Sequence, residues 1–239
     1  MNPELRIAQE LQEPEIFYTL QGEGRNIGEP ATFIRLSGCN LACVWCDTPY
    51  TWDWNNYDRE QEQLTIDIGT ASDRITGLKC ERVVITGGEP MLQQKSLNEL
   101  ITHIKGIDPQ YRFEVETNGT VKPKKETIDN VDQFNISPKL SNSGMAGYKR
   151  IKIDILKEYL ATEKADFKFV VDSHDDIYEV KLLQEQVNIP NNRIYLMPQG
   201  ITEPEQENKA AWVAELCKEY KYNFTPRLHI ALWGSGRGV

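Results

Sequence analysis

Short runs of β-branched and aromatic residues alternate along this chain with amphipathic stretches, and this alternation limits what it can fold into. The clearest run, residues 82–86 (RVVIT), is continuously apolar and ends in two glycines, which is typical of a strand buried on both faces of a parallel sheet. The stretch after it places Leu97 and Ile101 on one helical face. A strand, a helix and a further strand together form the repeating unit of a parallel α/β sheet.

This unit recurs and predicts a single domain over residues 1–239. We expect strands at 31–37, 82–86, 112–116, 133–136, 166–171 and 193–197, and helices at 64–78, 92–106, 149–160, 175–187 and 205–220. The tail at 227–233 (RLHIALW) is predicted to form a last strand or an edge of the sheet. Six such units predict an α/β fold with a mostly parallel six-stranded sheet. Because a closed barrel of this kind has eight strands, the fold is an incomplete, TIM-like barrel.

Composition excludes several classes of protein. The chain has 239 residues, and its 27 Lys+Arg against 36 Asp+Glu give a net charge of −9. An acidic chain with no Lys/Arg run longer than two repels the phosphate backbone, so we expect no nucleic-acid partner. No apolar run approaches the ~20 residues of a membrane-spanning helix. The first fifteen residues hold four glutamates and no apolar stretch, unlike a secretory signal, so we expect a cytoplasmic protein.

Three of the five cysteines fall within eight residues, Cys39, Cys43 and Cys46, with the spacing C-x3-C-x2-C. Three cysteines cannot all pair with one another, so the cluster predicts a metal site in a reducing compartment. Three thiolates are one short of the four that usually hold a [4Fe–4S] cluster, which would leave one iron open. An open metal position is what a catalytic site needs.

Two other interpretations of the cysteines stay open. A structural zinc ion needs four ligands, and the remaining candidates form no paired motif: Cys80, Cys217, His103, His174 and His229. Alternatively, the i, i+4, i+7 spacing could place three inert cysteines on one helix face in a core. The neighbouring Gly38 and Asn40 disfavour a helix there.

The cysteine spacing, with Trp45 directly before the last cysteine, resembles that of the radical S-adenosylmethionine (SAM) enzymes, and Gly87-Gly88-Glu89-Pro90 is similar to the glycine-rich motif of that family. The resemblance implies that the three thiolates hold a [4Fe–4S] cluster. It also implies that SAM chelates the fourth iron through its methionine amino and carboxylate groups. Reductive cleavage of SAM then yields a 5′-deoxyadenosyl radical, while the protein binds, orients and excludes water.

A longer series of motifs, in one order from residue 15 onward, resembles the 7-carboxy-7-deazaguanine synthase family. The motifs are EIF (15–17), LQGEG (20–24), FIRLSGC (33–39), WCDT (45–48), VITGGEP (84–90), ETNGT (116–120), ISPK (136–139) and LWGSGRGV (232–239). That family implies a Mg²⁺-dependent radical ring contraction of 6-carboxy-5,6,7,8-tetrahydropterin to 7-carboxy-7-deazaguanine, with loss of ammonia, for queuosine and related deazapurines. It also implies an electron donor such as flavodoxin or ferredoxin, and a homodimer.

The resemblance assigns a role to each matched residue. The cluster ligands are Cys39, Cys43 and Cys46, and Thr48 is the magnesium ligand. SAM is expected to contact Trp45, Cys46, Asp47, Gly88, Ser137, Pro138, Lys139 and Gln199. The pterin is expected to contact Leu20, Gln21, Gly22, Glu23, Arg35, Thr86, Trp233 and Val239. Residues 1–30 would then be an extension that carries a substrate loop, and residues 226–239 a tail that closes the site.

Simpler structural roles stand beside some of these assignments. Arg35 is expected to bind the substrate carboxylate, but a structural salt bridge to an acidic residue is the alternative. Thr48 taken alone would be a helix cap, Gly87-Gly88 a plain strand-to-helix turn, and the motif at 21–24 a tight turn.

The tail departs from the family pattern. Many members place a histidine six residues before a C-terminal carboxylate that reaches the substrate, and here that position is Trp233. Stacking of Trp233 on the pterin is the expected replacement, with the Val239 carboxylate as acceptor. The nearest histidine, His229, is either a ligand or an ordinary packed residue.

Two rival functions are considered. A radical activase that abstracts hydrogen from a partner protein's glycine shares the cysteines, but it does not account for the motif at 21–24 or for the tail. A zinc-stabilised binding module is the non-enzymatic alternative, and it would purify colourless with about one zinc ion.

Overall fold

The computed structural model describes residues 3–239, and its centre is one eleven-stranded sheet in the order β11-β10-β9-β8-β7-β6-β4-β1-β2, with β3 on β4 and β5 on β1. The strands are β1 Glu4–Glu10, β2 Glu13–Pro14, β3 Ile16–Leu20, β4 Pro30–Leu36, β5 Gln63–Asp67, β6 Arg82–Gly87, β7 Arg112–Thr117, β8 Gln133–Ile136, β9 Ala165–Val171, β10 Ile194–Pro198 and β11 Asn223–Phe224. From β4 to β11 every neighbouring pair is parallel, and the strands before residue 21 pair antiparallel.

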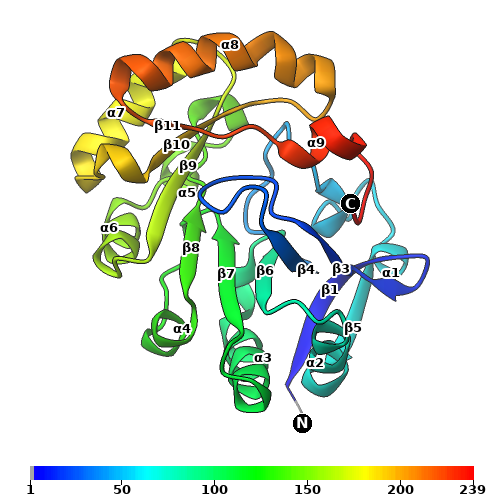
Figure 1. Cartoon of the computed structure of the whole chain (residues 1–239). Coiled ribbons are helices and arrows are strands. Elements are labelled where there is room, and N and C mark those ends of the chain that lie inside the picture. Colours follow the sequence, from blue (N-terminus) through cyan, green and yellow to red (C-terminus); the bar gives the residue numbers. More distant parts are fainter. Residues whose placement is uncertain (1–2) are drawn as a thin grey trace.

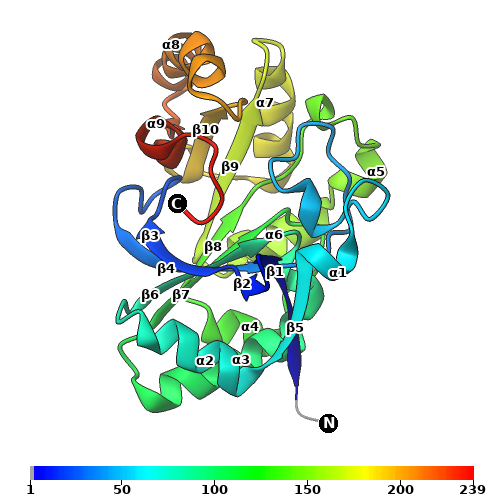
Figure 2. The ribbon, with the colours of Figure 1, turned by 90° about the vertical axis from the view of Figure 1, so that its right-hand side faces the viewer.

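Helices flank this sheet, most of them on its outer face (Figure 1), whereas the last one lies with the C-terminal end on the inner side (Figure 2). They are α1 Arg59–Glu62, α2 Ile68–Gly77, α3 Gln94–Ile107, α4 Lys125–Asn130, α5 Gly147–Arg150, α6 Ile153–Ala161, α7 Asp176–Val187, α8 Glu203–Tyr220 and α9 Leu228–Trp233. Short 3₁₀ turns lie at Pro49–Thr51, Pro90–Gln93, Ser141–Ser143 and Asn191–Arg193. Figure 2 shows the curved sheet with α2, α3 and α4 on its outer side and the C-terminal end on its inner side. The predicted α/β fold, a largely parallel open barrel, is confirmed.

The predicted parallel strands are buried as their apolar runs require. Val83, Val84 and Ile85 of β6 are fully buried, and all seven residues of β9 are buried. On the outer face, Val83 and Ile85 belong to the same apolar core as Leu97 and Ile101 of α3, which are fully buried. Helices α6 and α7 pack against β9. Helices on one face and an enclosed inner face explain why these strands read as continuous apolar runs.

The inner face of the sheet is polar and holds loop 21–29 in place. Glu114 of β7 is only 1 % exposed and forms an ion pair with Arg82 of β6. The same carboxylate accepts hydrogen bonds from the side chains of Asn26 (2.6 Å) and Asn135 (3.3 Å). A buried carboxylate needs such partners, so this group ties the loop to the strands.

Two sequence predictions were wrong at the N-terminal side. The expected helix at 64–78 is strand β5 followed by α2, because Asp67 caps α2 by accepting from the Thr70 amide at 3.0 Å. The sheet also has eleven strands instead of six: β1, β2 and β3 come from the region predicted to be a loop-bearing extension, and β5 and β11 were not predicted as strands. The longest connection in that region is loop 21–29 between β3 and β4, and a short turn at 11–12 joins β1 to β2.

The predicted last strand at 227–233 was also wrong. The last parallel strand is β11, and 228–233 forms helix α9. Pro226 ends the ladder after Thr225, whose amide still donates to the Leu196 carbonyl at 3.0 Å, because proline has no N–H to continue the pairing.

The two glycines after β6 allow an unusually close approach between backbones. A Cβ on Gly87 would lie 2.0 Å from the Leu36 carbonyl oxygen, and one on Gly88 would lie 2.2 Å from that of Gly38. The Gly88 and Glu89 amides donate to these same two carbonyls, at 2.9 and 2.8 Å. Residues 36–38 lead directly into the cysteine motif, and their close contact with residues 87–88 requires glycine at both of these positions.

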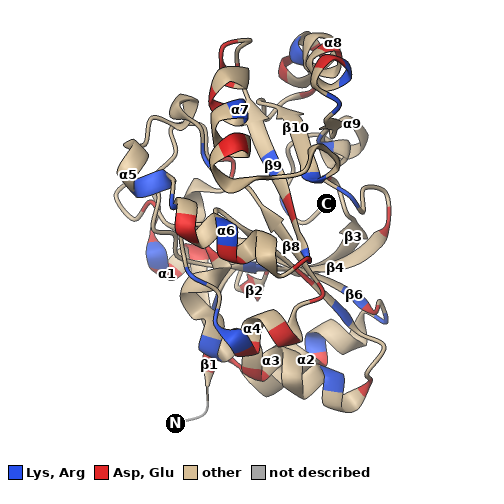
Figure 3. Ribbon diagram, turned by 90° about the vertical axis from the view of Figure 1, so that its left-hand side faces the viewer, with Lys and Arg blue, Asp and Glu red and all other residues tan. Residues whose placement is uncertain are grey.

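Charges of both signs are interspersed over the outer helices, as Figure 3 shows. Within residues 3–239, no helix is both long and apolar enough to cross a membrane.

The glycine contact predicts a stability difference between two alanine substitutions. Gly87→Ala places a Cβ against backbone at a φ of 124°, so we expect it to lower the free energy of unfolding by about 3 kcal/mol or more, or to prevent folding. Gly106→Ala, in α3 with nothing within 4 Å of the added Cβ, is the matched control and should leave stability unchanged or raise it by up to about 1 kcal/mol. Urea unfolding followed by circular dichroism measures both. Equal stability of the two variants would contradict the close approach.

Candidate functional site

A cavity of about 420 Å³ opens at the C-terminal ends of the parallel strands. This is where ligands bind in such sheets, and the volume suits a small molecule. Most residues assigned from the sequence line it: Leu20, Gln21, Gly22, Glu23, Arg35, Cys39, Cys43, Trp45, Cys46, Asp47, Thr48, Thr86, Gly88, Ser137, Lys139, Gln199 and Val239. Segments far apart in the sequence, from loop 21–29 to the last residues, thus converge on one space.

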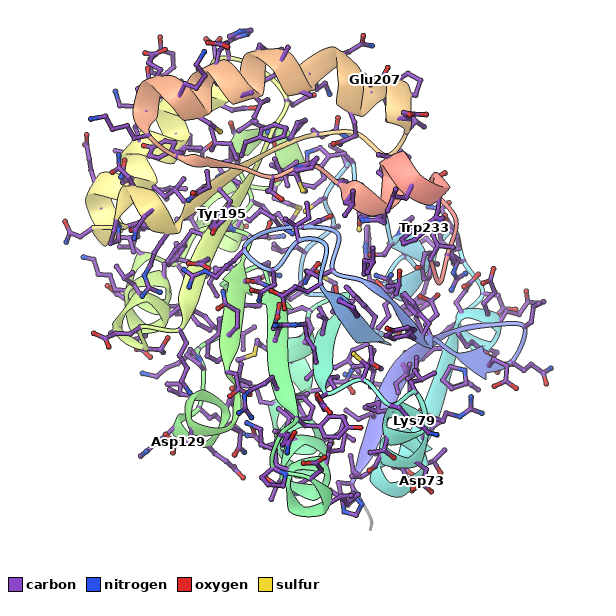
Figure 4. The ribbon with its side chains drawn as sticks, in the orientation of Figure 1. Asp73, Lys79, Asp129, Tyr195, Glu207 and Trp233 are labelled. Atoms are coloured by element: carbon purple, nitrogen blue, oxygen red, sulfur yellow. The ribbon has the colours of Figure 1, made fainter. Side chains whose placement is uncertain are left out.

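Two assigned residues, Pro138 and Trp233, are not part of the lining. Trp233 lies at the end of α9 and is 46 % exposed (Figure 4). His229, from the first turn of the same helix, does line the cavity. His229 and Trp233 are four positions apart, about 6 Å along the helix axis, which carries Trp233 beyond the rim. The structure therefore brings His229, and not Trp233, to the site.

The three clustered cysteines line the cavity as free thiols. The Leu41 amide donates to Cys39 Sγ at 3.5 Å, and Trp52 Nε1 donates to Cys46 Sγ at 3.3 Å. Burial raises the pKa of Cys39 to about 12 and also raises the pKa of Cys43. Cationic iron or zinc would favour the thiolate forms and offset this cost of burial.

Within residues 3–239 the other two cysteines do not line the cavity. Cys80 Sγ contacts the Pro30 carbonyl at 3.5 Å, and Cys217 Sγ contacts the Asn223 carbonyl at 3.4 Å. In the same range no three His, Cys, Asp or Glu side chains, the three clustered cysteines included, converge as ligands of a single ion. No fourth cysteine lines the cavity, and three thiols fit a cluster with one open iron better than a four-ligand zinc ion.

Glu89 of the glycine-rich motif fixes the cysteine loop against the end of β7. Its buried carboxylate accepts from Thr117 Oγ1 and from the Asn118 amide, both at 2.7 Å, and burial raises its pKa. The Asn118 side chain in turn donates to Asn40 Oδ1 at 3.0 Å. Because Asn40 follows Cys39 directly, these bonds set where the first thiol lies.

Lys139 and Trp45, both assigned to SAM, lie together. Lys139 Nζ is 5.5 Å from the centre of the Trp45 ring and donates to Ser137 Oγ at 3.0 Å. Trp45 Nε1 donates to the Asn142 carbonyl at 3.0 Å. Gln199 is held by Lys209, which donates to its Oε1 at 2.8 Å. These contacts orient the aromatic, cationic and amide groups around one side of the cavity.

Thr48, the expected magnesium ligand, precedes a 3₁₀ turn but does not cap it with its side chain. Its hydroxyl lies 3.8 Å from Cys46 Sγ. The simpler role as a helix cap is therefore not what this hydroxyl does.

Glu23 is the most strongly paired acid in the cavity. Lys168 of β9 pairs with one of its oxygens, and Arg227 Nε donates to the other at 3.0 Å. Burial alone would raise the pKa of Glu23, but the charges of Lys168 and Arg227 outweigh it and hold the pKa well below its usual range. Glu23 is thus a carboxylate at any physiological pH.

Arg227 also pairs with Asp47 and donates to the Gly200 carbonyl at 3.0 Å. Burial alone would raise the pKa of Asp47, and Arg227 with Arg35 lowers it. One guanidinium therefore joins loop 21–29, the segment after the cysteines and the end of β10. Sequence reasoning missed both Arg227 and Lys168, although Lys168 is the only cation within the apolar run of β9 and could have been found there.

Arg35 makes the salt bridge that the sequence left as an alternative. Its Nε donates to Glu15 Oε2 at 2.5 Å, while Arg237 binds the other oxygen of Glu15. Tyr50 Oη donates to the same carboxylate at 3.4 Å. Arg35 still lines the cavity, so its guanidinium has both a structural partner and access to a ligand.

The motif at 21–24 combines a braced side chain with a close glycine contact. Gln21 Oε1 accepts from the Glu23 amide at 3.1 Å, which turns this side chain toward its own loop. A Cβ on Gly22 would lie 2.2 Å from His229 Nδ1, and the Gly22 carbonyl accepts from the Leu228 amide at 2.9 Å. Burial lowers the pKa of His229, which favours the neutral imidazole.

Thr86, at the end of β6, donates to Glu116 of β7 at 3.0 Å. Both side chains face the cavity. Glu116 begins the ETNGT motif (116–120), but the sequence analysis assigned it no contact.

Comparison with known proteins agrees with this geometry. The sequence profile of the Radical SAM superfamily matches residues 33–152. The 7-carboxy-7-deazaguanine synthase of Pyrobaculum aerophilum is 38% identical over 94% of this chain and 95% of its own length. That of Halobacterium salinarum is 31% identical over 92% of this chain and 89% of its own. A crystal structure of QueE from Escherichia coli covers 95% of both chains, with 26% identity and a TM-score of 0.68.

The profile spans the three cysteines and the glycine-rich motif, and the relatives span nearly the whole chain. This chain belongs to the 7-carboxy-7-deazaguanine synthase family of radical SAM enzymes.

Proposed function

We propose that this chain converts 6-carboxy-5,6,7,8-tetrahydropterin to 7-carboxy-7-deazaguanine, with loss of ammonia, for the synthesis of queuosine and related deazapurines. The observation that carries this proposal is that the three clustered thiols and all the residues assigned to the pterin except Trp233 line a single cavity. A reactive group generated beside the thiols would therefore meet a substrate held by loop 21–29 without crossing solvent.

Cys39, Cys43 and Cys46 would hold the [4Fe–4S] cluster, since soft thiolates are its usual ligands. When bound, such a cluster supplies the electron that cleaves SAM. The chain's own contribution is to fix the thiols through the Asn40–Asn118 and Trp52–Cys46 contacts and to keep the site within a walled cavity.

One side of the cavity suits SAM. The Trp45 ring with Lys139 and Ser137 offers stacking and hydrogen bonds for a nucleoside, and the side-chain amide of Gln199 adds a donor and an acceptor. The backbone at Gly88 is free of a Cβ on the side of the cysteine loop. Asp47 and Pro138 complete the set that we assign to SAM, with Pro138 acting through the backbone turn after β8 rather than as part of the lining.

The rest of the lining suits a pterin that carries a carboxylate. Arg35 is the cation that we assign to this carboxylate, in a bidentate pair. Its present partner Glu15 would not be left unpaired, because Arg237 holds the same carboxylate. Lys168 and Arg227 are already neutralised by Glu23 and Asp47, so Arg35 is better placed for this role. Thr86, Leu20, Gly22 and His229 form the rest of the pterin wall.

Thr48 is the ligand that we assign to Mg²⁺. A hydroxyl without a capping bond, completed by waters and a substrate carboxylate, suits a hard cation that keeps much of its water. The ion's part would be to hold the substrate carboxylate beside the cluster side of the cavity.

We further infer three features that belong to the family assignment. The enzyme takes its electrons from a small donor protein such as flavodoxin or ferredoxin, and it works as a homodimer. Its cysteine-rich cluster requires a reducing compartment, so we place the enzyme in the cytoplasm.

The direct test is anaerobic reconstitution with iron and sulfide, followed by mass spectrometry of the products. With SAM, a chemical reductant, the carboxytetrahydropterin and Mg²⁺, we expect 5′-deoxyadenosine and 7-carboxy-7-deazaguanine to form together. Without Mg²⁺ the rate should fall. Cleavage of SAM without any deazaguanine would refute the proposed substrate, and no cleavage would refute the radical chemistry.

Cysteine substitutions test the cluster ligands. Cys39→Ala, Cys43→Ala and Cys46→Ala should each lose most of the bound iron and the brown absorbance, because two thiolates do not hold such a cluster firmly. Cys80→Ser, outside the cavity, is the matched control and should keep the iron of the unaltered protein. Iron analysis with visible spectra measures this. Iron lost equally from the Cys80 variant would count against the assignment.

A double substitution tests the contact between loop 21–29 and α9. Gly22→Ala pushes a methyl group against the His229 imidazole, so we expect the KM for the pterin to rise about tenfold or more. In a His229→Ala background the same glycine change should have little further effect, because the ring that it strikes is gone. Steady-state kinetics of the unaltered protein, the two single variants and the double variant give the coupling between residues 22 and 229 in the KM for the pterin. Purely additive effects would show that the two residues do not interact.

A further inference from the structure

The last five residues, 235–239, which we call the tail segment, line the cavity but belong to no helix or strand. Glycines occur at 234, 236 and 238, and two of them, Gly234 and Gly238, have φ near +70°. A glycine-rich segment of this kind has much conformational entropy to lose when it is ordered. Something must therefore hold it against the cavity.

The hydrogen bonds that hold the tail segment in the described part of the chain all come from one side chain, Arg237. Its guanidinium donates to Glu15 Oε1 and Glu62 Oε2, at 2.8 and 2.9 Å, and to the Gln9 carbonyl at 2.8 Å. Its central carbon also lies 3.6 Å from the centre of the Tyr50 ring. A planar, fork-shaped cation suits such a combination of charge pairing and stacking.

The buried partner of Arg237, Glu15, lies between β2 and β3 and is held by the backbone of the neighbouring strands. The Glu15 side chain is only 4 % exposed, its amide donates to the Ala8 carbonyl at 2.8 Å, and its own carbonyl accepts from the Arg35 amide at 3.0 Å. Arg237 is therefore joined to a rigid point, and release of its side chain would leave the other four residues of the tail segment without a hydrogen bond among residues 3–239.

Glu15 links this anchor to the pterin side of the cavity. Its two oxygens are shared between Arg237 and Arg35. If Arg35 turns toward a substrate carboxylate, Arg237 keeps the buried Glu15 charge paired, and this lowers the cost of the rearrangement.

We propose that Arg237 is a positioning residue: it is the one anchor that holds the tail segment as a wall of the substrate cavity, and it stabilises Glu15 when Arg35 engages the substrate. The anchoring role stands independently of the reaction, while the effect on substrate binding rests on the proposed function.

The test compares Arg237→Ala and Arg237→Lys with Arg74→Ala, a matched control that removes an exposed pair between Arg74 and Glu13 at 2.7 Å. Methyl NMR of valine-labelled protein, with Val239→Ala to assign the signal, reports the order of the tail segment without any turnover. Steady-state kinetics then give separate KM values for the pterin and for SAM.

We expect the Val239 methyl signals of Arg237→Ala to sharpen and to move to the shifts of a disordered peptide. The KM for the pterin should rise about tenfold or more, with that for SAM within about twofold. Arg237→Lys keeps the charge but not the forked guanidinium, so its Val239 signals and its KM for the pterin should lie between those of Arg237→Ala and the unaltered protein. Arg74→Ala should match the unaltered protein in both.

Unchanged Val239 signals in Arg237→Ala would overturn the anchor. Sharpened signals with an unchanged pterin KM would overturn the role in substrate binding. If the unaltered enzyme makes no deazaguanine while Arg237→Ala still releases Val239, the proposed function fails and the anchor stands, so the two failures are distinguishable.

Discussion

The close packing of Gly87 and Gly88 on the backbone of Leu36 and Gly38 is the contact on which the rest of the site depends. It joins the ends of β4 and β6 through two backbone hydrogen bonds, and so it fixes where the cysteine motif begins. From there Glu89 ties the end of β7 to the same place. The glycines of the motif thus serve the fold first, and the exposed backbone beside the cavity is a consequence of that packing.

Around this frame, the loop and tail segments that line the cavity are held by shared buried carboxylates. Glu114 braces loop 21–29, Glu23 joins that loop to β9 and Arg227, and Glu15 is divided between Arg35 and Arg237. Each acid has more than one cationic or amide partner, so each can lose one contact without becoming an isolated buried charge. This arrangement suits a site whose walls come from both ends of the chain and must close around a charged substrate.

The parallel strands and the cysteine motif could be predicted because their signals are local. The burial of a strand such as 82–86 can be inferred from its own apolar residues, and three thiols within eight residues indicate that they bind one ligand. The errors were of another kind: β5 needed its partner β1, and α9 replaced a strand because Pro226 interrupts the ladder after β11. Lys168, Arg227 and Arg237 were missed as site residues since their partners lie 145 to 222 positions away. Pairing at such distances leaves no periodic trace in the sequence.

The central claim is that three thiolates hold a cluster whose fourth iron is open to SAM. Mössbauer spectroscopy of protein reconstituted with ⁵⁷Fe, recorded with and without SAM, tests it most directly. The account predicts that one iron site of the four changes its isomer shift and quadrupole splitting when SAM is added, while the other three keep theirs. A spectrum that SAM leaves unaltered would contradict it, and so would evidence that a fourth protein side chain already binds the fourth iron.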